Sequence, residues 1–252
     1  MKISVVTVCY NSVDMIEETI LSVLNQTYPD VEYIIIDGGS TDGTVDIIKK
    51  YSGKIAYWIS EPDKGIYDAM NKGIAVATGS YINFMNSGDI FTKRDTINKI
   101  IPKLKESPTV LHGDIIKKTC YGDLHLSPPP LNVIQEKDPI FHQSAFINSK
   151  DMKLLQYDAS FKIAGDYKFF YELYKQNKTF LYVPEIIAIF DGTGISCTDD
   201  RTRLVENYRV QSKELTVLRR IYINYKVYRG KVRNLFLRFF PDLAMRIKKR
   251  RC

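Results

Sequence analysis

The sequence lacks the residue groupings from which zinc sites are built. Its four cysteines (Cys9, Cys120, Cys197 and Cys252) are scattered, no two form a Cys-x-x-Cys pair, and the three histidines do not cluster. Because a structural zinc site takes four closely grouped Cys or His ligands, the pattern argues against a zinc protein. Unpaired cysteines are also typical of a reducing compartment.

Long apolar runs are missing as well. No segment approaches 18 uninterrupted apolar residues, the length that predicts a membrane-spanning helix. Residues 1–6 form too short an apolar run for a secretory signal and are typical of a first strand. We therefore expect a cytoplasmic protein.

The glycine-rich phosphate-binding motifs are also absent. After the first predicted strand the chain reads Thr7-Val8-Cys9-Tyr10-Asn11-Ser12 instead of G-x-G-x-x-G, and no P-loop lysine motif occurs. A bound diphosphate would therefore need another counter-charge, which a metal ion on an acidic side chain can supply.

Charge is present in excess but unevenly distributed. The formal net charge is +7, yet residues 201–252 hold 16 Lys and Arg against 3 Asp and Glu, which leaves residues 1–200 at −6. An acidic body with a basic tail requires a separate explanation for each part.

Apolar runs rich in β-branched residues alternate with helical patterns through about residue 105. The predicted strands cover residues 3–8, 31–36, 55–59 and 81–85. Helices are expected between them, one capped by Ser12 and another over residues 66–77. This alternation predicts an α/β fold with one doubly wound, mainly parallel sheet.

Acidic residues follow three of these strands: Asp37, Asp63 and Asp89. Ligands of open α/β sheets bind beyond the carboxyl ends of the strands. Each acid on its own is equally an ordinary turn residue, as in Asn86-Ser87-Gly88-Asp89. Three at equivalent strand ends favour nucleotide binding, with Asp89 placed to hold a divalent cation.

Four segments, in this order, resemble the inverting glycosyltransferases of family 2. They are residues 4–11 (SVVTVCYN), 37–44 (DGGSTDGT), 61–73 (EPDKGIYDAMNKG) and 86–89 (NSGD). The resemblance covers roughly residues 2–196 and is closest to bacterial members that build capsule, O-antigen or exopolysaccharide. It implies a GT-A fold over residues 1–200, with a nucleotide-sugar half (1–101) and an acceptor half (102–200). Residues 201–252 would form a basic helical extension.

The resemblance also implies roles for single residues. Thr7, Tyr10 and Asn11 would line the nucleotide pocket, Asp37 would accept a hydrogen bond from the imide N–H of uracil or thymine, and Asp63 would contact base or ribose. Asp89 would bind Mg²⁺ or Mn²⁺. Many members carry Asp at the position of Gly88, and an acid is common at the position of Asn86. The implied donor is a UDP-sugar.

The second half holds two further candidates. Phe141–Phe146 is predicted as a buried strand, in which His142 is either a core histidine or, by resemblance, a contact of the donor sugar or its phosphates. Asp166 begins a predicted helix, where an acid is favourable for the helix dipole. By resemblance it is the catalytic base. Residues 180–190 are predicted as paired strands broken at Pro184, and residues 191–196 resemble an active-site loop of the family.

The basic tail is predicted to be helical, with one apolar stripe formed by Phe236, Phe239, Phe240 and Leu243. A packed helix, a nucleic-acid patch and an interfacial helix all fit a basic amphipathic segment. No nucleic-acid motif accompanies the charge. We favour a peripheral anchor, from about residue 231, on the anionic cytoplasmic face of the inner membrane.

Together these features predict an inverting, metal-assisted glycosyltransferase that acts on a glycan or lipid-linked acceptor in cell-surface polysaccharide synthesis. A nucleotidyltransferase is one alternative, but it would carry a glycine-rich loop after the first strand. A non-catalytic nucleotide-sugar or membrane-binding module is another, and loss of Asp166 or Asp89 would have favoured it. No motif indicates the sugar, the linkage, the acceptor or the oligomeric state.

Overall fold

The computed structural model describes residues 1–119, 122–191 and 199–239. In this part of the chain, nine strands form one sheet in the order β3-β2-β1-β4-β8-β6-β9-β5, with β7 paired to β6. The strands are β1 (Ile3–Cys9), β2 (Val31–Asp37), β3 (Tyr57–Ser60), β4 (Tyr81–Phe84), β5 (Ile90–Phe91), β6 (Val110–Lys118), β7 (Leu124–Leu126), β8 (Phe146–Asn148) and β9 (Phe180–Asp191).

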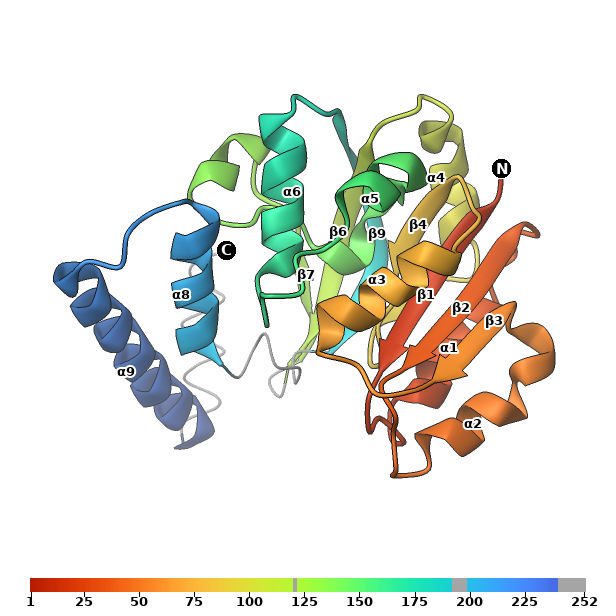
Figure 1. The fold of residues 1–252 in the computed structure, drawn as a ribbon, viewed down its shortest axis with the longest axis horizontal. Helices are drawn as coiled ribbons and strands as arrows, with labels where there is room; N and C mark the ends of the chain where they lie inside the picture. Colours follow the sequence, from red (N-terminus) through yellow and green to blue (C-terminus); the bar gives the residue numbers. More distant parts are fainter. Residues whose placement is uncertain (120–121, 192–198, 240–252) are drawn as a thin grey trace.

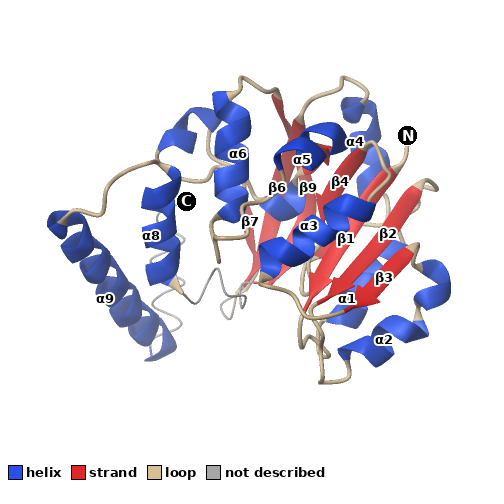
Figure 2. Ribbon diagram, in the orientation of Figure 1, coloured by secondary structure: helices blue, strands red, loops and turns tan. Residues whose placement is uncertain are grey.

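Helices cover both faces of this sheet (Figures 1 and 2). They are α1 (Ile16–Leu24), α2 (Thr44–Lys50), α3 (Ile66–Val76), α4 (Thr96–Leu104), α5 (Ser149–Leu155), α6 (Gly165–Lys175), α8 (Asp200–Val210) and α9 (Val217–Phe239). Short 3₁₀ helices are η1 (Ser52–Lys54), η2 (Leu131–Gln135) and η3 (His142–Ser144).

The strands β1 to β4 are parallel, and helices bury β1 from both faces of the sheet. All seven residues of β1 are buried, as expected for a strand covered on both faces. Val6 and Val8 pack toward α3 and α6, whereas Ile3 and Val5 pack toward α1, α2 and α4. The prediction of a doubly wound α/β sheet is confirmed.

The second half of the chain completes the same sheet. β8 lies antiparallel between β4 and β6, while β6 and β9 run parallel over most of their length. β5 comes from the first half but forms the far edge, beside β9. The sheet is thus mixed but mainly parallel, and it is continuous through both halves.

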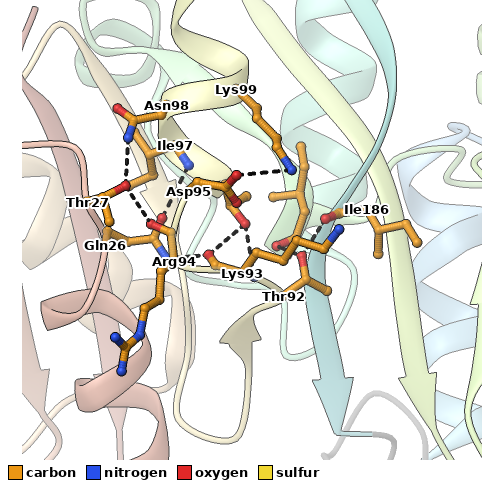
Figure 3. A network of polar contacts seen from close by, with 12 residues as sticks. Gln26, Thr27, Thr92, Lys93, Arg94, Asp95, Ile97, Asn98, Lys99 and Ile186 are labelled. Carbon is orange, nitrogen blue, oxygen red and sulfur yellow. Dashed lines mark hydrogen bonds and ion pairs between the residues drawn. The ribbon is translucent and has the colours of Figure 1, made fainter.

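A polar network fastens the turn around residues 92–95 to neighbouring elements (Figure 3). Gln26 Nε2 donates to the Lys93 carbonyl at 2.8 Å, and Asn98 Nδ2 donates to Thr27 Oγ1 at 2.6 Å. The Thr92 hydroxyl donates to the Ile186 carbonyl of β9. These bonds hold the end of α1, the start of α4 and β9 together on the face opposite α3.

Two predicted element boundaries are wrong. Ser12 does not cap α1, because its carbonyl closes a turn with the Met15 and Ile16 amides and the helix starts only at Ile16. Residues 141–146 are not one strand: His142–Ser144 form a 3₁₀ turn, which the Ser144 hydroxyl stabilises by donating to the Phe141 carbonyl, and β8 starts at Phe146.

Pro184 does not break β9 into two strands. The register with β6 passes from His112 opposite Tyr182 to Asp114 opposite Ile186, so Pro184 lies in a bulge where its missing N–H costs no ladder bond. Gly113 lies opposite this bulge. A Cβ there would meet the Glu185 carbonyl oxygen at 2.6 Å, which explains why glycine occupies the position.

The first helix of the basic extension packs on the sheet domain. Val210 of α8 belongs to the same buried cluster as Phe170 of α6. Within the described ranges, we find no helix both long and apolar enough to span a bilayer. Of the predicted membrane stripe, Phe240 and Leu243 and the side chains of Phe236 and Phe239 lie outside the described residues.

Candidate active site

The carboxyl ends of β1, β2 and β3 place Cys9, Asp37 and Ser60 side by side in register. Asp37 is fully buried, and its carboxylate accepts hydrogen bonds from the Gly39 and Ser40 amides and from the Ser60 hydroxyl at 2.6–3.1 Å. Burial acts to raise the pKa of Asp37, but hydrogen bonds from Ser40 and Ser60 outweigh it and hold the pKa below its usual value. Asp37 therefore organises the loop that follows β2.

Hydrogen bonds join the loop after β1 to the loop after β2. The Asn11 backbone amide donates to Ser40 Oγ at 2.7 Å, and the Thr41 backbone amide donates to Asn11 Oδ1 at 3.0 Å. Asp42 Oδ2 accepts from the Val13 amide at 3.0 Å. Asn11 has φ 45°, a left-handed conformation that Asn tolerates well. The predicted pocket residue Asn11 thus shapes the loop through its own side chain.

Asp63 and Tyr10 approach the same glycine. A Cβ on Gly38 would meet Asp63 Oδ2 at 2.4 Å and Tyr10 Cδ2 at 3.3 Å. Tyr10 is 63% exposed, so its ring forms part of the open surface beside Asp63. The structure therefore brings Tyr10, Asn11, Asp37 and Asp63 together at one edge.

Thr7 is set apart from this group. It lies within β1, is fully buried, and donates to the Met85 carbonyl at 2.7 Å, with Tyr33 Oη 3.0 Å away. In this position the hydroxyl ties β1 to the end of β4. The sequence resemblance had placed Thr7 on the pocket surface.

The turn after β4 presents oxygen atoms. Asp89 is 6% exposed, and Thr19 holds the turn by accepting from the Gly88 amide and donating to the Asp89 carbonyl. Gly88 has φ 95°, where an aspartate would be strained. Two buried oxygens of this turn, Asn86 Oδ1 and Ser87 Oγ, have no hydrogen-bond partner among the residues described.

These atoms suit a hard divalent cation. Among the described residues, no three His, Cys, Asp or Glu side chains gather to form a metal cage. Mg²⁺, however, commonly binds through one or two carboxylates together with substrate phosphates and water. One carboxylate with a neighbouring amide and hydroxyl oxygen, both lacking partners, fits that mode.

Asp166 lies in the first turn of α6, as predicted, with its side chain 22% exposed. Its Oδ2 is 3.7 Å from His142 Nδ1, and His142 Nε2 is 3.1 Å from Asn86 Nδ2. Because the Asn86 amide nitrogen donates, Nε2 accepts and the imidazole proton lies on Nδ1, toward Asp166. Burial lowers the pKa of His142, and the charge of Asp166 opposes this shift. Asn86 and His142 thus connect the turn of Asp89 to Asp166.

Asp166 is oriented from two further directions. Its Oδ1 accepts from the Tyr67 hydroxyl at 3.2 Å and from the Tyr167 amide at 2.8 Å. Lys168, two positions further along α6, is ion-paired with Glu172. Tyr67 comes from α3 of the first half, so both halves contribute to the surroundings of Asp166.

Asp138 and Tyr157 add to these surroundings. Burial raises the pKa of Asp138 well above its usual value, and the negative charge of Asp166 raises it further. Burial likewise raises the pKa of Tyr157, with added contributions from Asp166 and Asp138. The Tyr157 hydroxyl is buried without a hydrogen-bond partner in the part of the chain that the structure describes.

Sequence reasoning did not assign roles to Tyr67, Asp138 or Glu206. Glu206 lies on α8 and accepts backbone hydrogen bonds from the segment just before Asp166. Tyr67 stood within a segment that resembles the family, and Glu206 is one of three acids in the basic tail. Asp138 carried no signal, because only the fold brings it near Asp166.

Comparisons with known proteins place the chain among glycosyltransferase sequences. The chain is 36% identical over 174 residues to an uncharacterised glycosyltransferase of Mycobacterium tuberculosis, an alignment that spans 66% of each chain. It is 39% identical over 107 residues to a putative teichuronic acid biosynthesis glycosyltransferase of Bacillus subtilis, covering 41% of this chain and 42% of the relative.

Solved structures share the fold. Staphylococcus aureus TarS (residues 1–349) in complex with UDP-GlcNAc superimposes with a TM-score of 0.68 at 20% identity, over 84% of this chain and 65% of TarS. A mannosyltransferase from Pyrobaculum calidifontis, in complex with GDP-Man and Mn²⁺, gives 0.66 at 19% identity, over 82% and 63%. The fold is therefore GT-A-like. The model of the family described as "Glycosyl transferase family 2" matches residues 4–177, and the chain belongs to this family.

Proposed function

We propose that this protein is an inverting glycosyltransferase that moves a sugar from a UDP-sugar to a hydroxyl group of a glycan or lipid-linked acceptor. The observation that carries the proposal is the contact chain from the 86–89 turn through Asn86 and His142 to Asp166. It joins a set of oxygens suited to a metal-bound diphosphate to a carboxylate suited to proton abstraction. Neither a nucleotidyltransferase nor a non-catalytic module accounts for both.

In the proposed reaction Asp166 acts on the acceptor. Its carboxylate takes the proton of the acceptor hydroxyl, and the oxygen attacks the anomeric carbon from the face opposite the nucleotide. The new C–O bond forms as the bond to the phosphate oxygen breaks, UDP leaves, and the proton remains on Asp166. The hydrogen bonds from Tyr67 and the Tyr167 amide hold the carboxylate in place.

Asp89, with Asn86 Oδ1 and Ser87 Oγ, would hold Mg²⁺ or Mn²⁺. Such an ion stabilises negative charge on a departing diphosphate. The Mn²⁺ complex of the Pyrobaculum mannosyltransferase supports a metal in this fold. Neutral His142 would then donate from Nδ1 toward the region between this turn and Asp166.

The nucleotide site would lie at the edge formed by Tyr10, Asn11, Asp37 and Asp63. Asp37 would reach a base only by giving up one of its internal hydrogen bonds. Asp63, beside the exposed Tyr10 ring, is therefore the better placed acceptor for the imide N–H of uracil. The UDP-GlcNAc complex of TarS supports a uridine nucleotide, whereas the GDP-Man complex makes guanine the competitor to test.

A membrane surface is the proposed partner, and the described part of α9 supports it. Leu218, Ile221, Tyr222, Tyr225, Tyr228 and Val232 are all exposed. With successive helix residues about 100° apart, these side chains fall within an arc of about 120°, opposite the buried Ile223. The sequence of α9 contains no acidic residue; Arg229 falls within the arc, and Lys226 and Arg233 border it. Such a helix fits the interface of an anionic leaflet.

The test is release of UDP from a panel of UDP-sugars, with and without Mn²⁺, together with calorimetry of UDP, dTDP and GDP. We expect UDP to bind most tightly and at least one UDP-sugar to be hydrolysed slowly when Mn²⁺ is present. Clear preference for GDP would overturn the choice of nucleotide. Failure to bind any nucleotide would overturn the proposed function itself.

A further inference from the structure

We propose that Glu206 on α8 is a positioning residue that sets the place of Asp166 through the loop of residues 162–164. The inference rests on the proposed role of Asp166 as base and names a part of the chain that supports it. The family model matches residues 4–177, so Glu206 lies beyond the region that the resemblance describes.

Both carboxylate oxygens of Glu206 accept hydrogen bonds from the loop. Glu206 is 7% exposed, and its Oε1 accepts from the Lys162 amide at 2.8 Å. Its Oε2 accepts from the Ile163 and Ala164 amides, both at 2.9 Å. Hydrogen bonds to an ionised acceptor are stronger than neutral ones. The backbone immediately before α6 is therefore held by a carboxylate from a different helix.

Ile163 carries this restraint to Asp166. While its amide donates to Glu206, its carbonyl accepts from the Tyr67 hydroxyl at 2.6 Å. The same hydroxyl lies 3.2 Å from Asp166 Oδ1. Glu206, Ile163, Tyr67 and Asp166 thus form one continuous chain of contacts.

Close packing limits how far this chain can move. A Cβ on Gly165 would meet the Tyr67 ring at 2.7 Å, so the ring lies directly against the start of α6. Displacement of the 162–164 loop would therefore move Tyr67 and the first turn of α6 together. Asp166 is in that turn.

Arg209 gives α8 a second hold on the same segment. Its guanidinium lies 4.2 Å from the centre of the Phe161 ring and donates to Ser160 Oγ at 2.6 Å. One turn of α8 thus contacts residues 160–164 through both the Glu206 carboxylate and the Arg209 guanidinium. The two contacts together restrain the backbone that leads into α6.

The decisive experiment compares Glu206→Gln with Glu214→Gln. Both replace a glutamate of the basic extension, but the Glu214 side chain is exposed. In Glu206→Gln an NH₂ group faces backbone donors, so the loop loses part of its restraint. We expect kcat for sugar transfer to fall roughly 10–100-fold, as for a small misplacement of a catalytic group, with UDP affinity unchanged. The Glu214 variant should match the wild type.

A second readout needs no substrate. The Ile163 and Ala164 amides donate to Glu206 Oε2, so their exchange with solvent reports directly on this contact. In Glu206→Gln both amides should exchange faster, whereas in Glu214→Gln they should exchange at the wild-type rate. An inactive wild type would thus contradict the proposed function and leave this readout intact.

Unchanged kcat together with unchanged exchange of the Ile163 and Ala164 amides in Glu206→Gln would overturn the proposal. So would loss of UDP binding in proportion to activity in a variant that keeps its native circular dichroism spectrum, because the effect would then not be confined to Asp166. If Glu206→Gln does not fold, Tyr67→Phe removes one hydroxyl from the same chain of contacts and is measured in the same way. Unchanged kcat and unchanged exchange of the Ile163 amide in that variant would then refute the inference.

Discussion

The carboxylate of Asp166 is held in one orientation by its neighbours. The Tyr67 hydroxyl and the Tyr167 amide occupy Oδ1, which leaves Oδ2 toward His142 and the proposed acceptor. Asp166→Asn keeps the shape and these contacts nearly intact but cannot accept a proton. We expect kcat to fall by roughly 10²–10⁴ with nucleotide affinity unchanged, measured by transfer kinetics and calorimetry. Transfer at nearly the wild-type rate would make Asp158 and Asp191 the next candidates for the base.

Asp89 is the proposed metal ligand, and its replacement should remove metal binding without affecting folding. Asp89→Ala should nearly abolish both transfer and the Mn²⁺-dependent part of UDP binding, while the circular dichroism spectrum stays native. Calorimetry of UDP with and without Mn²⁺ checks this expectation. Full activity of the wild type in EDTA would rule out the metal, whatever the variant does.

Asp138 makes stability depend on pH. Burial and the charge of Asp166 raise its pKa in the folded state above the ordinary value near 4. The stability contributed by its neutral form is therefore complete below about pH 4 and is lost as the pH rises through the folded pKa. Asp138→Asn should keep the hydrogen bond from the Ile140 amide and remove this loss.

We accordingly expect Asp138→Asn to raise the melting temperature more at pH 8 than at pH 5. Asp123→Asn, at an exposed acid, serves as the control and should behave alike at both values. Scanning calorimetry at the two pH values measures the difference. Equal effects at both pH values would show that Asp138 is ionised throughout.

Among the elements, the bulge of β9 leaves no room for a side chain at Gly113. Gly113→Ala would place a methyl group 2.6 Å from the Glu185 carbonyl oxygen, a backbone atom that cannot rotate away. We expect a loss of about 1–3 kcal/mol in the free energy of unfolding. Urea denaturation of Gly113→Ala and Gly53→Ala makes the comparison, because a Cβ at Gly53 meets no described atom within 4 Å. A comparable loss in both variants would refute the steric explanation.

The elements also show where sequence reasoning succeeds. The strands β1 and β2 were predictable because buried parallel strands produce continuous β-branched runs that end at polar turns. The Pro184 bulge was not, since a proline looks like a strand break unless the partner register is known. His142 was placed in a strand because apolar neighbours do not reveal that the Ser144 amide and hydroxyl both donate to the Phe141 carbonyl and close a 3₁₀ turn.

The candidate site was predictable to a similar extent. Asp37, Asp63 and Asp89 follow strand ends, and Asp166 begins a helix, so local pattern was sufficient to propose them. Asp138 and Glu206 lie far from these residues in sequence, and only tertiary packing gives them a part in the candidate site. Thr7 differs, because the resemblance that implied a pocket role does not say which hydroxyl reaches the surface, and the structure buries this one.

At the scale of the whole molecule, α9 presents its exposed stripe away from α8 and the sheet. The triple variant Leu218→Ser/Ile221→Ser/Tyr225→Ser should bind anionic vesicles at least about tenfold more weakly, since burying one Leu or Ile contributes about 1.5–3 kcal/mol. Hydrolysis of the donor should not change. Vesicle sedimentation at low and high salt measures binding, with Leu154→Ser, another exposed leucine, as control.

Unaltered vesicle binding by the triple variant would contradict the membrane role of this stripe. A change from dimer to monomer in light scattering would instead identify the stripe as an interface between two copies. Loss of folding would show that the stripe packs within the protein.

The order of the strands limits how the acceptor specificity can be changed by recombination. The simplest chimaera would take the second half from a relative, with a junction near residue 101. Here such an exchange would replace β8 beside the retained β4, and β9 beside the retained β5. A foreign second half must therefore match two separate strand registers of its host, and the Thr92 bond to β9 as well. Chimaeras that carry residues 90–92 along with the second half keep the β5–β9 seam native and should fold more often than those joined at 101.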